Sequence, residues 1–310
     1  MSEIVKVNTD SVRFVDRVLA ECRASANTEV VMSGYQRGLV QGYFLTLDSM
    51  LKAAETKRQS MIAAGSKYAS PTPYDWNHIN LQQVALDCLS YSRMGLDSQA
   101  RNHIYPIAYH NKSAGRYDIN FMIGYRGLGL IAKKYGIDPP ENITCELVYS
   151  NDTFAIKKKG GWNDGDSFTF EVTNPFDRGS IVGGFAYFSY ADSTKNRIYT
   201  ITKAELDKRK KPENIQFWGG VKDKWENGKK VGQEVVEGWA TEMYQKTLER
   251  WAYNKIELDP EKVDESVKHM QMRELEMTKM QMQEEIEQKA NMIVIDDDTG
   301  GVNKDDPVDF

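Results

Sequence analysis

Cysteine and histidine are scarce in this chain of 310 residues, which contains three cysteines and four histidines. The cysteines lie far apart and form no CxxC pair, so the sequence indicates neither a disulfide framework nor a cysteine zinc site. The histidines form no HExxH or HxH pair, and no cysteine stands beside them at the spacing of metal ligands. Metal chemistry therefore has little support in the sequence.

Long apolar runs are also missing. No stretch approaches the roughly 18 apolar residues that cross a bilayer as a helix. The opening residues MSEIVKVNTD lack the basic flank and the apolar stretch of a secretory signal. We therefore expect a protein without membrane contact that stays in the cytoplasm, a reducing compartment in which unpaired cysteines are usual.

Signatures of catalysis and of nucleotide binding are absent as well. The glycine-rich segment from Gly124 to Gly129 has the form GxxGxG, whereas nucleotide loops have the form GxGxxG or end in GK[ST]. No GxSxG elbow is present, and the acidic pair Asp164 and Asp166 lies in a glycine-rich turn, where solvated carboxylates are the commoner explanation. We therefore expect a protein that is not an enzyme and requires no cofactor.

The net charge of -5 conceals an uneven distribution. Residues 260–310 hold six Lys or Arg against fourteen Asp or Glu, so the rest of the chain carries a net charge of +3. A basic body is compatible with a polyanionic partner, and an acidic tail with a separate role. A solvated surface with a solubilising tail explains the composition equally well.

The first part of the chain has the apolar spacing of amphipathic helices. One helix is expected after a cap at Asp10 or Ser11, and a longer one over residues 35–62. A loop with two prolines, SKYASPTPYDW, follows. A third helix over residues 81–93 ends at Gly95, where the chain can take a left-handed turn.

The middle of the chain has the pattern of strands. Residues 104–109 and 117–123 predict a hairpin across the polar loop HNKSAG, and a short helix over residues 126–135 ends at Gly136. Further strands are expected over residues 143–149, 153–158, 167–172, 181–190 and 197–201. The predicted fold class is therefore α+β, with a small sheet and a hairpin packed by helices.

Helices return in the last third. The capping-box pattern from Thr202 to Glu205 opens a helix that is expected to run into the basic residues 208–211. A helix over residues 238–255 has an apolar face that can close the core. Beyond Pro260 a methionine-rich helix is expected, whose methionines fit ordinary packing or, as an alternative, a face that binds a partner. The acidic end of the chain has the composition of a disordered tail.

These patterns divide the chain into three regions: a helical N-terminal region (1–78), a central core (79–258), and the methionine-rich helix with the acidic tail (259–310).

Basic residues interleaved with aromatics are the clearest chemical pattern. Residues 101–134 hold six Lys or Arg against the single acid Asp118, and residues 195–224 hold nine against four acids. The aromatics of the first segment are Tyr105, Tyr109, Tyr117, Phe121 and Tyr125. Single-strand binding without sequence preference requires cations for the phosphates and flat apolar faces for the bases. The same aromatics also fit alternating core positions beside solvated charges.

One segment, FMIGYRGLGLIAKKYG (residues 121–136), resembles the central motif of the RecT family of phage recombinases, also called single-strand annealing proteins. Further blocks resemble the family in the same order, namely VALDCLSYSRMGLD (84–97), IYPIAY (104–109), LVYSNDTF (147–154), GGFAYF (183–188), ITKAEL (201–206) and GWATEMYQKTLERW (238–251). The resemblance covers about residues 84–256. This sequence departs from the family in carrying Arg126, where relatives often have lysine, and in its longer HNKSAG loop.

The resemblance implies a DNA-binding protein that works without ATP. It would coat single-stranded DNA as an oligomer and anneal it to a complement in homologous recombination, holding the annealed duplex afterwards. The core would bind DNA. The N-terminal helices and the methionine-rich acidic tail are not matched to the family, and from composition alone the first are expected to supply oligomer contacts and the second to meet partners. A phage exonuclease and a host single-stranded-DNA-binding protein are expected partners, and magnesium is expected only as a modulator. Six acidic and apolar residues at the end, DDPVDF, resemble the tip of bacterial single-stranded-DNA-binding proteins.

The same resemblance nominates the DNA-binding residues. Arg126 is the first choice for a phosphate contact, with Tyr125 beside it. Gly124 and Gly127 would let the backbone approach the strand, and Gln245 would bond a phosphate or base. The remaining candidates are Lys112 and Arg116 on the hairpin, Lys133 on the helix that follows it, and the i, i+4 pair Lys246 and Arg250.

Two alternatives remain open at this point. A nuclease or another DNA-processing enzyme could use Asp or Glu with a divalent ion, and it would cut a labelled strand. A protein that merely protects single strands would bind DNA without accelerating the pairing of complements.

Overall fold

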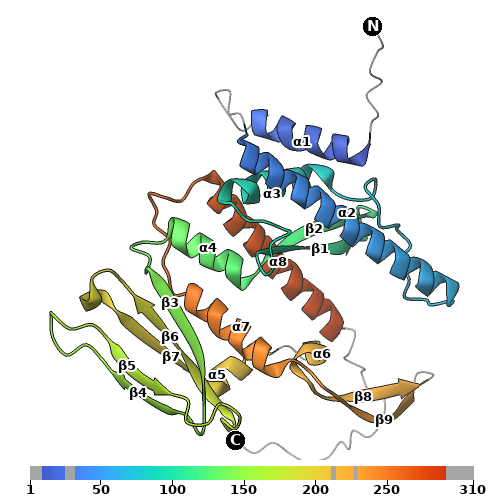
Figure 1. The fold of residues 1–310 in the computed structure, drawn as a ribbon. Helices are drawn as coiled ribbons and strands as arrows, with labels where there is room; N and C mark the ends of the chain where they lie inside the picture. Colours follow the sequence, from blue (N-terminus) through green and yellow to red (C-terminus); the bar gives the residue numbers. More distant parts are fainter. Residues whose placement is uncertain (1–8, 25–31, 211–213, 227–228, 291–310) are drawn as a thin grey trace, which may run out of the picture.

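The computed structural model describes residues 9–24, 32–210, 214–226 and 229–290. Figure 1 shows a mainly helical part with one hairpin and a second part built on a three-stranded sheet, with further helices between them. All the sheets are small and antiparallel. The predicted α+β class is therefore confirmed.

The first part contains three helices, α1 (Asp10–Ala24), α2 (Gly34–Ala63) and α3 (Leu81–Met94). α2 begins at a capping box, in which the side chains of Ser33 and Gln36 each accept a hydrogen bond from the other residue's N–H group. α3 ends at Gly95, whose φ of 86° is the left-handed turn expected there. Apolar side chains of the three helices, with Phe14 and Tyr43 fully buried, form the main core.

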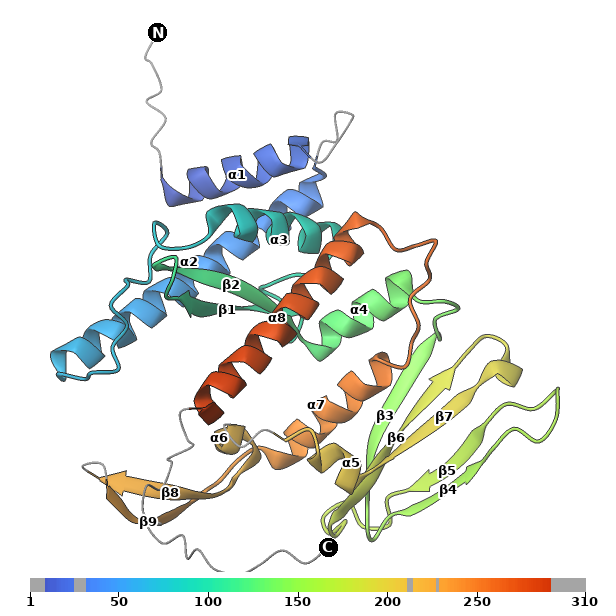
Figure 2. The ribbon, with the colours of Figure 1, turned by 180° about the vertical axis from the view of Figure 1, so that it is seen from behind.

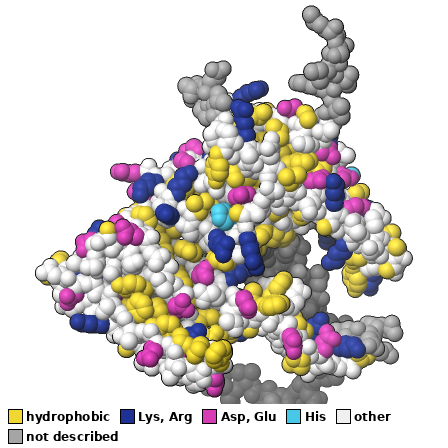
Figure 3. All heavy atoms as spheres, in the orientation of Figure 1, with side chains coloured by type: hydrophobic (Ala, Val, Ile, Leu, Met, Phe, Trp, Pro, Cys, Tyr) yellow, Lys and Arg dark blue, Asp and Glu magenta, His cyan; other side chains and the backbone are white. Residues whose placement is uncertain are grey.

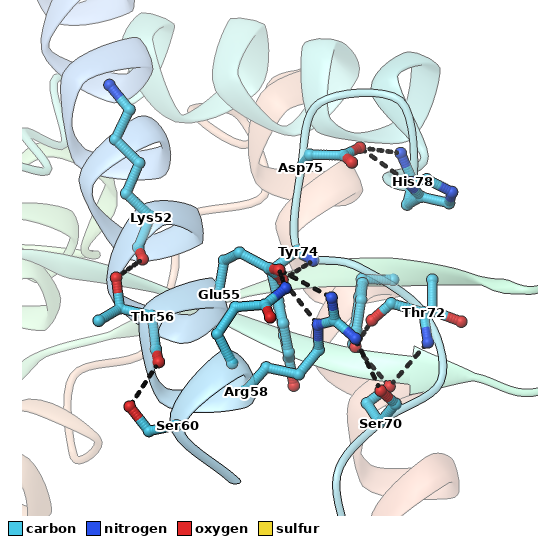
Figure 4. Close-up of polar contacts among 12 residues, drawn as sticks. Lys52, Glu55, Thr56, Arg58, Ser60, Ser70, Thr72, Tyr74, Asp75 and His78 are labelled. Atoms are coloured by element: carbon cyan, nitrogen blue, oxygen red, sulfur yellow. Dashed lines mark hydrogen bonds and ion pairs between the residues drawn. The ribbon is translucent and has the colours of Figure 1, made fainter. Parts of the chain in front are cut away.

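The proline-containing loop after α2 is hydrogen-bonded to the last turns of that helix (Figure 4). The Glu55 carboxylate accepts two hydrogen bonds of 2.8 Å from the Arg58 guanidinium and one of 2.9 Å from the Tyr74 N–H. These bonds lower the pKa of Glu55 to about 2. Arg58 also donates to the Ser70 carbonyl at 3.2 Å. The loop thereby holds the Tyr74 ring in a stack on Tyr117, with centroids 3.9 Å apart.

The predicted hairpin follows α3. It pairs β1 (Ile104–Asn111) with β2 (Arg116–Ile123) in one continuous antiparallel register. Tyr117 and Phe121 are buried in the main core, so of the two interpretations of the aromatics the core position holds for these two. The Tyr105 side chain is exposed and remains available for contact.

The second part begins with α4 (Tyr125–Tyr135) and continues with β3 (Asn142–Tyr149), β4 (Thr153–Lys157), β5 (Ser167–Glu171), β6 (Ile181–Ser189), the short 3₁₀ helix η1 (Ser193–Lys195) and β7 (Arg197–Thr202). Strands β3, β6 and β7 form a sheet in the order β3-β6-β7, and β4 pairs with β5. The Phe154 ring of β4 stacks on Phe185 of β6 with centroids 4.8 Å apart, so the two sheets share a core. The helix and all five strands lie where the sequence predicts them.

The region after β7 differs from the prediction. The capping box of Thr202 is present, but α5 (Lys203–Asp207) ends before the basic residues that the predicted helix includes. Pro212 follows closely, and a helix cannot pass a proline without losing a hydrogen bond. The short α6 (Ile215–Trp218) comes next. A hairpin of β8 (Gly220–Glu226) and β9 (Lys229–Val236) follows, where the sequence predicts no strand.

α7 (Ala240–Tyr253) is the helix predicted over residues 238–255, and it contacts β3 and β6 of the three-stranded sheet. Its Leu248 and Ala252 side chains are fully buried. Leu248 also packs closely against Gly184 of β6. α7 also contacts α4.

α8 (Glu265–Ala290) contains the predicted methionine-rich helix, and it begins beside α3 in the first part and runs downward from there in the view of Figure 2. Val267 and Met270 are buried in the main core, so the beginning of α8 is a core element. None of the described helices is long and apolar enough to cross a membrane. The acidic end that the sequence predicts to be disordered, residues 291–310, lies outside the described residues.

Candidate nucleic-acid interface

A surface pocket of about 580 Å³ lies where the start of α4, the edge strand β3 and α7 meet, and we name it the α4–α7 pocket. Four of the predicted site residues line it, namely Tyr125, Arg126, Gln245 and Lys246. Figure 3 shows Lys and Arg side chains gathered near the middle of this face of the molecule, over α4 and between α4 and α7. Residues from separate sequence motifs therefore meet at one place.

The charges around the pocket are mixed. It is lined by Arg101, Arg126, Arg178 and Lys246 and by the carboxylates of Glu146, Glu242 and Glu249. The Arg178 guanidinium is occupied, because it bonds both oxygens of Asp152 at 3.0 and 2.6 Å. Arg101, Arg126 and Lys246 are exposed, and in the described part of the chain none of them forms an ion pair. Three cations are thus available for an anion such as a phosphate.

The start of α4 is docked on the loop before β1. The Gly124 N–H donates to the His103 carbonyl at 2.8 Å. The N–H groups of Arg126 and Gly127 donate to the Asn102 carbonyl at 3.1 and 3.3 Å. A Cβ on Gly124 would lie 2.2 Å from the Asn102 carbonyl oxygen, and one on Gly127 would lie 2.3 Å from that of His103. Contact with the chain's own backbone accounts for both glycines, and their approach to a DNA strand stays a prediction.

Tyr125 and Arg126 lie side by side in the first turn of α4. The Tyr125 hydroxyl accepts a hydrogen bond from Asn102 Nδ2 at 3.2 Å. The Arg126 guanidinium lies 5.9 Å from the centroid of the Tyr125 ring. A cation and a flat ring this close together can contact a phosphate and a base of the same strand.

α7 forms the other wall of the pocket. Lys246 is exposed on this wall. The Gln245 side-chain amide donates to the Cys145 carbonyl and to the Glu249 carboxylate, both at 3.0 Å. Burial next to this wall raises the pKa of the Cys145 thiol to about 12, so the thiol stays neutral. The amide nitrogen of Gln245 is engaged with protein, and its oxygen is the atom left for a ligand.

The other predicted cations do not line this pocket. Arg250 donates to the Ile123 carbonyl at 2.7 Å and lines a separate pocket between α4, α7 and α8, so it does not form a pair with its i, i+4 neighbour on the α4–α7 pocket. Lys133 lines a third pocket, of about 380 Å³, which shares Arg126 with the first. Lys112 and Arg116 lie at the turn end of the β1–β2 hairpin. Their contact with DNA stays a prediction.

The predicted site residues do not include Arg101, Asn102, Tyr149 and Arg178, which also line the pocket. The Arg178 guanidinium lies 4.1 Å from the centroid of the Tyr149 ring and donates to the Leu147 carbonyl at 2.9 Å. No spacing in the sequence links Arg178 to β3, because it comes from the loop before β6. Asn102 has a positive φ of 65°, which asparagine tolerates better than most residues. That tolerance is a weak signal that the sequence did contain.

The sequence model of the RecT family matches residues 72–288, well over half of the chain. The match includes every predicted DNA-binding residue and the whole of the α4–α7 pocket. It begins after α1 and α2 and extends into α8. No curated protein and no solved structure matches the chain. The chain therefore belongs to the RecT family of single-strand annealing proteins, which bind single-stranded DNA and act in recombination.

Proposed function

We propose that this protein binds single-stranded DNA across the α4–α7 pocket and anneals it to a complementary strand without ATP, acting as an oligomer along the DNA. One observation carries the proposal: Tyr125, Arg126, Gln245 and Lys246 come from distant motifs and line a single pocket. Family membership supports the annealing activity, and the pocket supports its location.

The mechanism follows from the residue types. Arg101, Arg126 and Lys246 hold the strand by its phosphates, because each neutralised phosphate releases condensed counterions. The Tyr125 ring supports a base without reading its pairing edge. The pairing edges then stay open to a second strand, and base pairing supplies the specificity. The three carboxylates of the pocket keep the affinity for one strand moderate, which allows strands to be exchanged before the match is complete.

We assign self-association to the N-terminal region. Three large apolar side chains of α2, Tyr35, Leu45 and Ile62, are exposed, and apolar groups of this kind are frequent in protein interfaces. Replacing them with serine should reduce the mass of the DNA-bound assembly in light scattering, while the affinity of a single protomer for a short oligonucleotide stays the same. An unchanged mass would show that these α2 side chains do not form the interface between protomers.

Other expected partners belong to the C-terminal region. We propose that residues 259–310 meet an exonuclease and a host single-stranded-DNA-binding protein, and that the protein works in the cytoplasm. Magnesium acts as a competitor for phosphates and not as a cofactor. Within the described residues, no group of three His, Cys, Asp or Glu side chains is placed to hold a metal ion. Raising magnesium at constant ionic strength should weaken DNA binding smoothly, whereas a magnesium requirement would contradict this role.

The test is the annealing of two complementary labelled oligonucleotides without ATP. The wild-type protein should accelerate pairing at low salt. Arg126→Ala and Lys246→Ala should slow it, and each should reduce the slope of log affinity against log salt by about 0.7, the value of one phosphate contact on a single strand. Lys157→Ala is the matched control, because Lys157 is exposed on β4 and lies outside the pocket.

The rival functions give different results in the same experiment. Cleavage of the labelled strand that depends on a divalent ion would favour a nuclease. Binding without faster pairing would favour passive protection of single strands. Equal losses from Lys157→Ala and Arg126→Ala would show that net charge, and not the pocket, governs the binding.

A further inference from the structure

Asn102 lies at the junction of the elements that build the α4–α7 pocket. It precedes β1, faces the start of α4 and lines the pocket itself. We propose that Asn102 is a positioning residue, which sets Tyr125 and Arg126 in the orientation that receives the DNA strand. This inference rests on the proposed function.

The backbone of Asn102 anchors the first turn of α4. Its carbonyl accepts the N–H groups of Arg126 and Gly127, which are among the N–H groups that a helix cannot satisfy within itself. Asn102 makes these contacts with a φ of 65°. The close approach also requires a glycine at position 124, where a Cβ would lie 2.2 Å from this oxygen. The backbone of Arg126 is thus fixed relative to the loop before β1.

The side chain of Asn102 joins two aromatic residues. Its Oδ1 accepts a hydrogen bond from the Tyr105 hydroxyl at 2.7 Å, and its Nδ2 donates to the Tyr125 hydroxyl at 3.2 Å. Tyr105 is on β1 and Tyr125 is on α4, so the amide bridges the hairpin and the helix. The amide oxygen and nitrogen both have protein partners. Asn102 therefore holds Tyr125 in place, while a second hydrogen on its Nδ2 stays available in the pocket.

The backbone carbonyl and the side-chain amide of residue 102 have different roles, and substitutions can separate them. Glycine keeps the positive φ and the carbonyl but removes the bridge between the tyrosines. Aspartate keeps an acceptor for Tyr105 and loses the donor to Tyr125. Alanine loses the bridge and strains the backbone. Asn102→Gly is therefore the substitution that isolates the side chain.

A double-mutant cycle tests the inference. Asn102→Gly should weaken the binding of single-stranded DNA by about three- to tenfold, the effect of losing one hydrogen bond. Tyr125→Phe should have an effect of similar size, since it removes the hydroxyl and keeps the ring. The double variant should bind single-stranded DNA with the same affinity as the more affected single variant, because both changes break the same bridge. Asp138→Gly is the control: apart from Asn102, Asp138 is the one described non-glycine residue with a positive φ, and it lies outside the pocket.

Additive losses in the cycle would overturn the inference, because they would show that Asn102 contacts DNA independently. Unchanged affinity of Asn102→Gly would overturn it as well. A second measurement needs no DNA: amide hydrogen exchange in peptides that cover residues 124–128 should become faster in Asn102→Gly and stay unchanged in Asp138→Gly. Unchanged exchange at the start of α4 would also overturn the inference. If the wild-type protein neither binds nor anneals DNA, the proposed function fails, and the exchange experiment still decides whether Asn102 positions the helix.

Discussion

Asp87 of α3 and His269 of α8, 182 positions apart in the chain, are hydrogen-bonded at 2.7 Å. The Asp87 side chain is fully buried, and its carboxylate also forms an ion pair with Arg273 at 3.2 Å. Arg273 donates in turn to the Asn120 side chain of β2 at 2.7 Å. A polar network thus crosses the contact of α3, β2 and α8 and fixes the register of α8 on the main core.

Removing Asp87, the centre of this network, should destabilise the protein. Asp87→Ala removes the buried carboxylate shared by His269 and Arg273 and leaves Arg273 only its ion pair with the exposed Glu276, so we expect the free energy of unfolding to fall by about 3 kcal/mol. Chemical denaturation measures this change. Lys268→Ala on the same helix breaks an ion pair whose two side chains are exposed, and it should change the unfolding free energy by less than about 1 kcal/mol. Equal effects of the two substitutions would contradict the importance of the buried network.

The Glu55 carboxylate should make stability depend on pH. Its pKa of about 2 in the folded protein lies below the ordinary value of 4.5, because Arg58 and the Tyr74 N–H donate to the charged form. The stabilisation is therefore fully present above pH 4.5 and is lost as the pH falls from there to about 2. Urea unfolding of the wild-type protein and of Glu55→Gln should give curves that differ most near neutral pH and converge at the acidic end. Parallel curves would contradict the assignment.

Gly124 should tolerate no side chain. Gly124→Ala places a Cβ 2.2 Å from the Asn102 carbonyl oxygen, so we expect a loss of about 1–3 kcal/mol of stability together with weaker DNA binding. Gly38→Ala is the matched control within α2, because nothing lies within 4 Å of its Cβ. That change should stabilise the protein by up to about 1 kcal/mol, since alanine favours a helix interior. Thermal and chemical unfolding would measure both effects.

Arg178 and Arg126 line the same pocket, yet they should respond differently to substitution. Arg178 is bonded to both oxygens of Asp152 and lies on the Tyr149 ring. Arg178→Ala should therefore lower the stability by about 1–3 kcal/mol and leave the salt slope of DNA binding nearly unchanged. Arg126→Ala should leave the stability nearly unchanged and reduce the salt slope of DNA binding. A reduced salt slope in Arg178→Ala would mean that its guanidinium also binds a phosphate.

Local chemistry explains why most of the fold could be predicted. The hydrophobic spacing of α1 to α4, the capping box of Thr202 and the turn at Gly95 depend on residues close together in sequence. The β8–β9 hairpin was missed because its strands carry lysines and acids, and its pairs, such as Lys222 with Glu234, form only once the strands meet. Alternation alone does not decide between a core position and an exposed stacking face, which is why the sequence leaves both open for Tyr117.

The site was predictable where family motifs named its residues and not where tertiary contacts create it. Arg126 and Lys246 were chosen from separate motifs, and they line one pocket. Helical spacing predicts that Arg250 shares a face with Lys246, but its guanidinium donates to the Ile123 carbonyl. Asn102 belongs to the site because of its positive φ and its hydrogen bonds with the hydroxyls of Tyr105 and Tyr125. No spacing in the sequence predicts these contacts.

The burial of Val267 and Met270 in the main core has a consequence for folding during synthesis. A ribosome has synthesised α1, α2 and α3 long before α8 leaves the exit tunnel, so the nascent helices expose the apolar surface that α8 later covers. Contacts of such long sequence separation slow folding and favour aggregation of incomplete chains. The protein therefore reaches its native state only after translation is nearly complete, and a chain truncated before residue 265 should be found in the insoluble fraction of the cell.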